Sequence, residues 1–184
     1  MPSFDLTDRV AIVTGGSQGF GKAIAIGLAH QGANIVVAAR EPENVTLGRE
    51  RPHAPVKPVV DEILSIGSRV LGITCDVRNL PDVEKMVDET ISTFGRIDIL
   101  INVVGGSWGE TFRSGPLLEL EEHDFLECYK VNVITAFQCA KSVQPIMKAQ
   151  GKGTIVNIAS GAGINPGTGQ AAYGAAKAGV INMT

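Results

Sequence analysis

The stretch Val10-Ala-Ile-Val-Thr-Gly-Gly-Ser-Gln-Gly-Phe-Gly21 joins a short apolar run to a glycine-rich turn. The run predicts a buried strand, and the residues from Gly19 onward predict a helix. Glycines let the backbone of such a turn approach a pyrophosphate, and the helix N-terminus adds N–H groups and a positive dipole end. The turn alone could equally be a plain connection, and its Gly-x-x-x-Gly-x-Gly spacing differs from Gly-x-Gly-x-x-Gly. The strand–turn–helix context favours a dinucleotide-phosphate loop, whose candidate binding residues are Gly15, Ser17, Gln18, Gly19, Phe20 and Gly21.

Strand and helix patterns alternate along the rest of the chain, which predicts a parallel sheet covered by helices on both faces. We therefore expect an α/β fold with a doubly wound, Rossmann-like parallel sheet, in a single domain over residues 1–184. The expected strands are Val10–Thr14, Asn34–Ala39, Arg69–Cys75, Ile97–Asn102 and Thr154–Ala159. The expected helices are Gly19–Gln31, Val59–Ile66, Asp82–Phe94, Glu121–Ala149 and a last one from Ala171 onward.

The composition is that of an ordinary globular protein, with 44% hydrophobic residues, 19% charged residues and a net charge of −3. This mild negative charge argues against nucleic-acid and anionic-membrane partners. The first nine residues lack the pattern of a signal peptide, so we expect a cytoplasmic protein. The widely spaced Cys75, Cys128 and Cys139 are expected to be small buried side chains. The histidines show no ligand spacing, and no metal site is expected.

The end of the second predicted strand bears on which dinucleotide binds. An acidic side chain there would hold a ribose 2′-hydroxyl, whereas Ala39 is followed by Arg40, whose charge favours a 2′-phosphate. The sequence thus favours NADP, with NAD as the second choice, although Arg40 could instead pair with Glu41. The proline-rich segment Glu41–Pro58 predicts an exposed excursion. Its Arg49 and Arg51 are expected in solvent, with contact to the cofactor phosphate as the alternative.

The ends of the third and fourth strands carry polar residues. Asp76, followed by Val77, could accept a hydrogen bond from an adenine amino group or could cap the next helix. Asn102 closes the fourth strand and precedes a loop through Gly105 that could lie against a cofactor.

Two aromatic residues and one asparagine follow in less regular surroundings. Trp108 and Phe112 could form a substrate wall or could simply pack their loop, and both interpretations stay open. Asn132 stands in the apolar run Val131–Ile134 of a long predicted helix. A polar side chain there needs a partner, so it serves either a structural bond or the site.

A third cluster lies near the end of the chain. Ser160 ends the fifth predicted strand, and Tyr173 and Lys177 are four residues apart on the helix that follows. That spacing puts both side chains on one helix face. A tyrosine hydroxyl normally titrates near pH 10, and a neighbouring ammonium favours its phenolate form. Serine can hold a substrate oxygen by a hydrogen bond. The three suit proton transfer at a carbonyl or alcohol oxygen.

Together these motifs resemble the short-chain dehydrogenase/reductase family over essentially the whole chain. Thr14–Gly21 resembles its cofactor loop, Asp76-Val77 its adenine contact, Asn102-Val-Val-Gly105 its Asn-Asn-Ala-Gly strand end, and Asn132, Ser160, Tyr173 and Lys177 its catalytic tetrad. Two valines replace Asn and Ala in the strand-end motif, which bears on packing against the adenosine.

The resemblance implies a role for each member of the tetrad. Tyr173 would be the acid–base, Ser160 would orient the substrate carbonyl, and Lys177 would bind the nicotinamide ribose beside Tyr173. Asn132 would hold a water in a proton relay to Lys177. The expected reaction is interconversion of a ketone and a secondary alcohol by hydride transfer with NADP(H).

The resemblance also bears on assembly and on completeness. It implies pairing through the helices that carry Asn132 and Tyr173, as a homodimer or homotetramer. Family members usually continue for two more strands and a substrate-covering segment, so we expect a C-terminally truncated form whose Thr154–Ala159 strand is an apolar edge. The alternative function is a truncated, catalytically inactive nucleotide-binding module.

Overall fold

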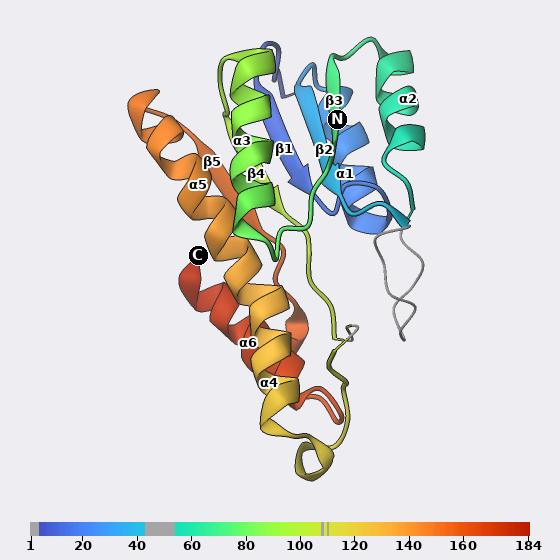
Figure 1. The fold of residues 1–184 in the computed structure, drawn as a ribbon, viewed down its shortest axis with the longest axis vertical. Coiled ribbons are helices and arrows are strands. Elements are labelled where there is room, and N and C mark those ends of the chain that lie inside the picture. Colours follow the sequence, from blue (N-terminus) through green and yellow to red (C-terminus); the bar gives the residue numbers. More distant parts are fainter. Residues whose placement is uncertain (1–3, 43–53, 108, 110) are drawn as a thin grey trace.

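The computed structural model describes residues 4–42, 54–107, 109 and 111–184. Its centre is a five-stranded parallel sheet in the order β3-β2-β1-β4-β5 (Figure 1). The strands are β1 Val10–Thr14, β2 Asn34–Ala39, β3 Val70–Thr74, β4 Ile99–Asn102 and β5 Thr154–Asn157. The expected doubly wound parallel sheet is confirmed. The sheet order reverses at β1, so its topological switch point lies between the carboxyl ends of β1 and β4.

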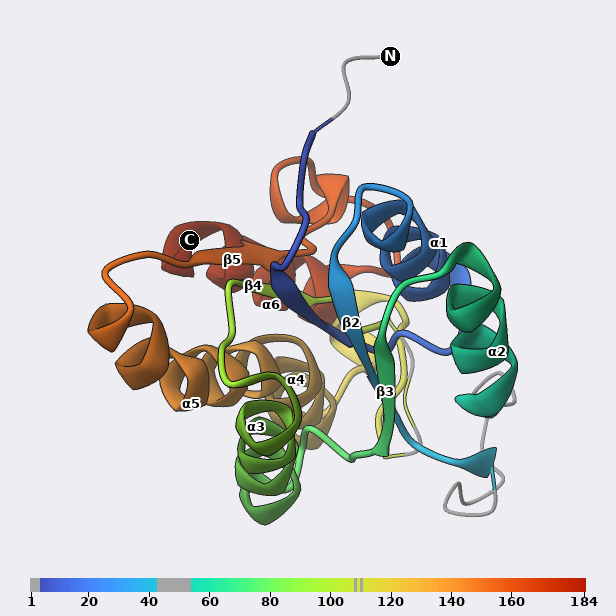
Figure 2. The ribbon, with the colours of Figure 1, turned by 90° about the horizontal axis from the view of Figure 1, so that it is seen from above.

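Helices cover both faces of this sheet (Figure 2). One face packs against α1 Gly19–Ala29 and α2 Lys57–Ile66. The other packs against α3 Leu80–Phe94 and α5 Thr135–Ala149. The remaining helices, α4 Glu122–Tyr129 and α6 Ala171–Met183, pack against each other around a third apolar cluster. None of the helices in the part of the chain that the structure describes is long and apolar enough to cross a bilayer.

Strand β1 shows why these residues form a central strand. Val10 and Ile12 enter the core under α3 and α5, whereas Ala11 and Val13 enter the core under α1 and α2. Side chains of a strand alternate between faces, so an unbroken apolar run is the pattern of a strand buried on both sides. Cys75, Cys128 and Cys139 are buried free thiols, as predicted.

Strand β5 is less buried than the sequence predicts. It lies at one edge of the sheet and pairs with β4 through the register Asn102↔Asn157. Thr154 and Val156 are exposed along it, with 39% of Val156 accessible. The apolar run Thr154–Ala159 taken by itself predicts a buried strand, and this prediction is wrong for Thr154 and Val156, whereas the expected apolar edge describes the strand.

Two helices also differ from the prediction. The expected excursion to Pro58 ends earlier, because α2 begins at Lys57 and accommodates Pro58 in its first turn, where no backbone donor is lost. The single helix predicted over Glu121–Ala149 is divided by a π-helical turn, Lys130–Ile134. A π turn inserts an extra residue, and here it carries Asn132. Arg49, Arg51 and Trp108 lie outside the described residues, so the predictions for them stay predictions.

Candidate cofactor and catalytic site

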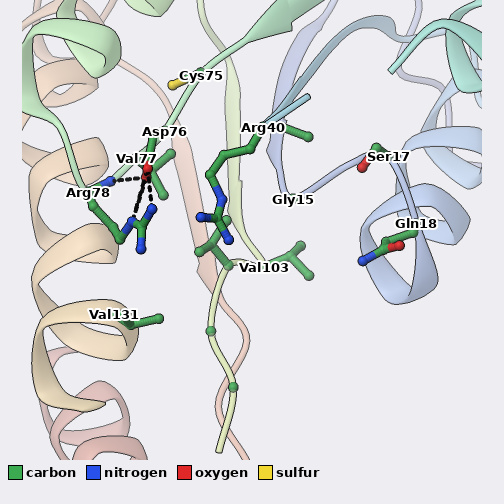
Figure 3. A pocket seen from close by; sticks show the side chains of 14 residues that line it. Gly15, Ser17, Gln18, Arg40, Cys75, Asp76, Val77, Arg78, Val103 and Val131 are labelled. Atoms are coloured by element: carbon green, nitrogen blue, oxygen red, sulfur yellow. Dashed lines mark hydrogen bonds and ion pairs between the residues drawn. The ribbon is translucent and has the colours of Figure 1, made fainter. Parts of the chain in front are cut away.

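The carboxyl ends of the strands surround a cavity of about 230 Å³. Loops after β1, β2, β3 and β4 contribute its walls, as expected for the ligand crevice of a doubly wound sheet. Figure 3 shows Ser17 and Gln18 on one side, Asp76 and Arg78 on the other, and Arg40 between them. The lining residues are Gly15, Ser17, Gln18, Ala39, Arg40, Cys75, Asp76, Val77, Arg78, Val103, Val104, Gly105, Gly106 and Val131.

The backbone conformation and close packing of the turn after β1 require glycine at several positions. Gly15 and Gly19 have φ values of +65° and +53°, which side chains other than glycine disfavour. A Cβ on Gly21 would overlap the carbonyl oxygen of Gly15, so the start of α1 packs directly on the turn. Gly15, Ser17 and Gln18 line the cavity. Gly19, Gly21 and Phe20 belong to the turn and the first residues of α1 without lining it, and the Phe20 ring is exposed.

The Thr14 hydroxyl joins the two loops at the switch point. It donates to the carbonyl oxygen of Ile101 at 3.3 Å and accepts from the Val103 N–H at 3.1 Å. Val103 and Val104 then line the cavity, and Val104 lies 3.3 Å from where a Cβ of Gly15 would stand. Valine at these two positions is therefore compatible with a closely packed strand-end loop.

The Asn102 side chain is buried at the end of β4. Its Nδ2 donates to Asn157 Oδ1 at 2.9 Å and to the Ala136 carbonyl at 3.3 Å. The side chain thus ties β4 to β5 and α5, and the residues after it form the cavity wall. A direct contact between Asn102 and a cofactor stays a prediction.

Charged groups gather at the far wall of the cavity. The Arg78 guanidinium pairs with the Asp76 carboxylate, with Nε 3.0 Å from both oxygens and a terminal nitrogen 2.6 Å from Oδ2. The Asp76 carboxylate does not cap α3: Asp82 instead bonds the Asp76 N–H and the Asn79 side chain. Arg40 also lines the cavity, between this pair and Ser17 (Figure 3). Sequence reasoning missed Arg78, although a basic residue two positions after an acidic strand end was a usable signal.

Lys177 is the most deeply buried cation of the site, with 3% of its surface exposed. Its Nζ donates to the Ile158 carbonyl at 2.7 Å and lies 5.8 Å from the centre of the Tyr173 ring. Burial lowers the pKa of the Lys177 ammonium, because a charged amine loses hydration there. The predicted pairing of Tyr173 and Lys177 on one face of α6 is thus realised in the geometry.

Asn132 holds the loop after β4 against this lysine. Its Oδ1 accepts from the Gly106 N–H at 3.0 Å, and its Nδ2 donates to the carbonyls of Gly106 and Cys128 at 2.9 Å each. A Cβ on Gly105 would stand 2.6 Å from Asn132 Oδ1 and 3.1 Å from Lys177 Nζ. Gly105 is therefore the point where the cavity wall, the asparagine and the lysine meet.

Ser160 is placed next to α6 by small residues. It begins a short 3₁₀ turn, Gly161–Gly163, and its Oγ accepts from the Ala162 N–H at 3.2 Å. A Cβ on Gly163 would stand 2.7 Å from backbone atoms of α6, and one on Gly174 would stand 2.8 Å from the Ala162 carbonyl oxygen. Close backbone packing therefore holds the turn that follows Ser160 against α6, the helix that carries Tyr173.

Phe112 has a packing role. It is buried in the cluster formed by α4 and α6, together with Cys128, Ala172 and Ala176. The Tyr173 ring packs against the same cluster. Of the two interpretations left open by the sequence, the structure favours loop packing for Phe112, and this packing supports the helix of Tyr173.

Comparisons with known proteins agree with this architecture. The short chain dehydrogenase family matches residues 9–184. Among curated relatives, the chain is 40% identical over 179 residues to (2S)-((R)-hydroxy(phenyl)methyl)succinyl-CoA dehydrogenase subunit BbsD of Thauera aromatica, covering 97% of this chain and 65% of that protein. It is 36% identical over 179 residues to the 3-oxoacyl-acyl-carrier-protein reductase of Synechocystis sp. strain PCC 6803, covering 97% of this chain and 66% of that protein. The chain therefore spans about two thirds of the length of these relatives.

Solved structures give the same picture. An NAD⁺-bound xylitol dehydrogenase superposes with a TM-score of 0.85 at 29% identity, covering 98% of this chain and 64% of that one. A 7α-hydroxysteroid dehydrogenase complexed with NADH and 7-oxo glycochenodeoxycholic acid gives the same TM-score at 30% identity and the same coverage. By sequence and by fold, this chain belongs to the short chain dehydrogenase family.

Proposed function

We propose that this chain carries the cofactor site and the proton-transfer residues of an NADP(H)-preferring oxidoreductase that interconverts a ketone and a secondary alcohol. The observation that carries the proposal is the buried Lys177, bonded to the Ile158 carbonyl at 2.7 Å with the Tyr173 ring beside it and Asn132 across Gly105. A buried ammonium whose pKa is lowered, with a tyrosine near it, is typical of a site that moves protons.

The residues present fit a nicotinamide dinucleotide. The turn from Gly15 to Gly21 leads into the first backbone N–H groups of α1, which would hold a pyrophosphate, and a Cβ on Gly21 would collide with the Gly15 carbonyl oxygen and displace this turn. Arg40 gives the adenosine wall a cation suited to a 2′-phosphate. Asp76, Val77 and Ser17 line the cavity, where Asp76 and Val77 would hold an adenine and Ser17 would add a hydroxyl.

A bound nicotinamide supplies the hydride, and the protein supplies orientation, a proton and electrostatic stabilisation. In this proposal the Tyr173 hydroxyl gives a proton to the substrate oxygen during reduction and takes it back during oxidation. Ser160 donates a hydrogen bond to the same oxygen. Lys177 binds the nicotinamide ribose and stabilises negative charge on the Tyr173 oxygen. Asn132 fixes the loop at Gly106, and in this proposal it also holds a water in the proton relay to Lys177.

A pair of tyrosine variants tests the acid–base assignment. Tyr173→Phe keeps the ring packing and removes only the hydroxyl, so turnover with a panel of ketones should fall by at least about a hundredfold while NADPH affinity stays within about twofold. Tyr129→Phe is the matched control, because Tyr129 is the other tyrosine and is partly exposed on α4. Equal losses in binding and turnover for Tyr173→Phe would refute the role. Binding of NADPH without turnover in the unmodified chain would support the inactive nucleotide-binding module instead.

The cofactor preference rests on Arg40 and has its own test. Arg40→Asp should weaken NADPH binding and strengthen NADH binding, because a carboxylate repels a 2′-phosphate and accepts from a 2′-hydroxyl. Lys152→Asp makes the same charge change at an exposed position before the amino end of β5. It should leave the ratio of the two dissociation constants unchanged. A fluorescence titration measures both, and an unchanged ratio for Arg40→Asp would remove Arg40 from the proposal.

We also propose that two copies pair through the outer face of α4, α5 and α6, as a homodimer or as half of a homotetramer. This face exposes Tyr129, Phe137, Ile181 and Met183 beside a groove between α6 and the helices before it. Exposed large apolar side chains gathered on one face favour association. Sedimentation of the unmodified chain and of Phe137→Asp tests the pairing. A monomeric unmodified chain would contradict it.

A further inference from the structure

The pair formed by Asp76 and Arg78 is more constrained than a surface ion pair. Arg78 binds Asp76 through its backbone N–H at 3.0 Å from Oδ1 and through two guanidinium nitrogens. The Asp76 N–H is itself held by Asp82 at 3.1 Å. Both side chains face the cavity from the wall opposite Ser17 (Figure 3). The carboxylate is therefore fixed in direction as well as in place.

The surroundings also keep this carboxyl group ionised. Burial by itself would raise the pKa of Asp76, but hydrogen bonds from Arg78 and the charges of Arg78 and Arg40 outweigh it and lower that pKa. At neutral pH the Asp76 side chain can then only accept hydrogen bonds. The side chains of Asp76 and Arg78 are 28% and 35% exposed, and pairs so accessible contribute little to folding stability. Stabilisation of the fold therefore does not explain why Arg78 holds Asp76 so closely.

A fixed and ionised carboxylate such as that of Asp76 can distinguish between purine bases. Adenine carries an amino donor on its six-membered ring, whereas hypoxanthine has a carbonyl oxygen at the same position. An ionised carboxylate attracts the amino group and repels the carbonyl oxygen. We propose that Arg78 is a positioning residue for base selection, which holds Asp76 turned into the cavity so that adenine dinucleotides are bound in preference to hypoxanthine dinucleotides. This inference rests on the proposed cofactor site and deepens it.

The test compares NADPH with its hypoxanthine analogue, reduced nicotinamide hypoxanthine dinucleotide phosphate, which has the same phosphates and riboses. Titrations of the intact 184-residue chain followed by fluorescence give both dissociation constants. The unmodified chain should bind NADPH at least about tenfold more tightly, the value of one good hydrogen-bonded base contact. In Arg78→Gln this ratio should fall to about threefold or less, mainly through weaker NADPH binding.

Two further variants separate positioning from general charge loss. Asp76→Asn should bring the ratio near one, because an amide can face either purine, and adding Arg78→Gln to it should change the ratio no further. Arg69→Gln is the matched control, since Arg69 stacks on Phe94 away from the cavity, and it should leave the ratio unchanged. A melting curve for each variant verifies that it is folded.

The outcomes discriminate between the inference and the function it rests on. If Arg78→Gln weakens the binding of both nucleotides by the same factor, base selection by Arg78 is overturned. Arg78 would then contribute only its positive charge to binding. An unmodified chain that binds both nucleotides equally also overturns it, while leaving the cofactor site intact. Failure of the unmodified chain to bind either nucleotide overturns the proposed function and this inference together.

Discussion

Replacing Gly105 by alanine would test whether the cavity wall and the proton-transfer residues form one packed unit. The added Cβ would stand 2.6 Å from Asn132 Oδ1 and 3.1 Å from Lys177 Nζ, and the first distance is too short for any carbon–oxygen contact. Asn132 cannot retreat freely, because its amide makes hydrogen bonds with Gly106 and Cys128. The substitution therefore forces either overpacking or the loss of buried hydrogen bonds.

The expected cost follows from these two routes. Overpacking a well-filled site costs about 1–3 kcal/mol, and leaving a buried polar group unpaired costs a similar amount. A loss of about 2–3 kcal/mol should lower the melting temperature by about 5–10 °C in a domain of this size. Because Lys177 is displaced as well, NADPH affinity should fall in Gly105→Ala even at temperatures where the chain is fully folded.

A second glycine provides the control. Gly27 lies in the middle of α1, is exposed, and would have no atom within 4 Å of an added Cβ. Gly27→Ala should stabilise the chain by about 0.5–1 kcal/mol, because alanine is the better helix former. Calorimetry and a fluorescence titration measure both variants. If Gly105→Ala melts within about 1 °C of the unmodified chain and binds NADPH equally well, the close packing of Gly105, Asn132 and Lys177 is refuted.

Two further substitutions probe the supporting structure. Phe112→Ala should lower the free energy of unfolding by about 3–5 kcal/mol, measured by urea denaturation, because it leaves a cavity in the buried cluster between α4 and α6. Phe137→Ala, on an exposed face, should lower it much less. Equal losses for the two variants would contradict the packing role of Phe112. Asp98 is buried, which alone would raise the pKa of its carboxyl group, but hydrogen bonds from Arg96 and Val10 lower it below 3.8. The stability that the Asp98 carboxylate contributes is therefore present above pH 3.8 and is lost as the pH falls through the lowered pKa. Asp98→Asn should make the free energy of unfolding fall less steeply at acid pH. An unchanged slope would show that other carboxyl groups cause the loss of stability.

The parts of the fold that the sequence predicted are those governed by local pattern. Val10–Val13 is apolar at every position, as expected for a strand that is buried on both faces. Gly15 and Gly19 mark a turn with positive φ, which few other residues adopt. The order of strands and helices followed from the same rules, and the family resemblance supplied the spacing from Asn132 to Lys177.

What the sequence did not predict depends on contacts between distant segments. The π turn at Lys130–Ile134 cannot be read from helical periodicity, because its extra residue is compensated by the bonds of Asn132 to Gly106, 26 positions away. The exposure of Val156 depends on its strand being at the edge of the sheet, which local pattern does not reveal. Arg78 was overlooked because a charged residue after a strand is usually solvated, and its spacing from Asp76 suggests a pair without fixing the direction of the two side chains.

The loop after β4 links the two halves of the candidate site. Gly106 lines the cavity and is held at both its N–H and its carbonyl by Asn132, while Gly105 separates Asn132 from Lys177. A ligand that shifts this loop must therefore strain the same hydrogen bonds that position the lysine. Coupling of this kind is reciprocal, so a change in the cavity should alter the environment of Lys177 as much as a change at Lys177 alters binding in the cavity. Glycine at position 105 is what permits this contact, because any side chain there would separate the cavity wall from the asparagine and the lysine.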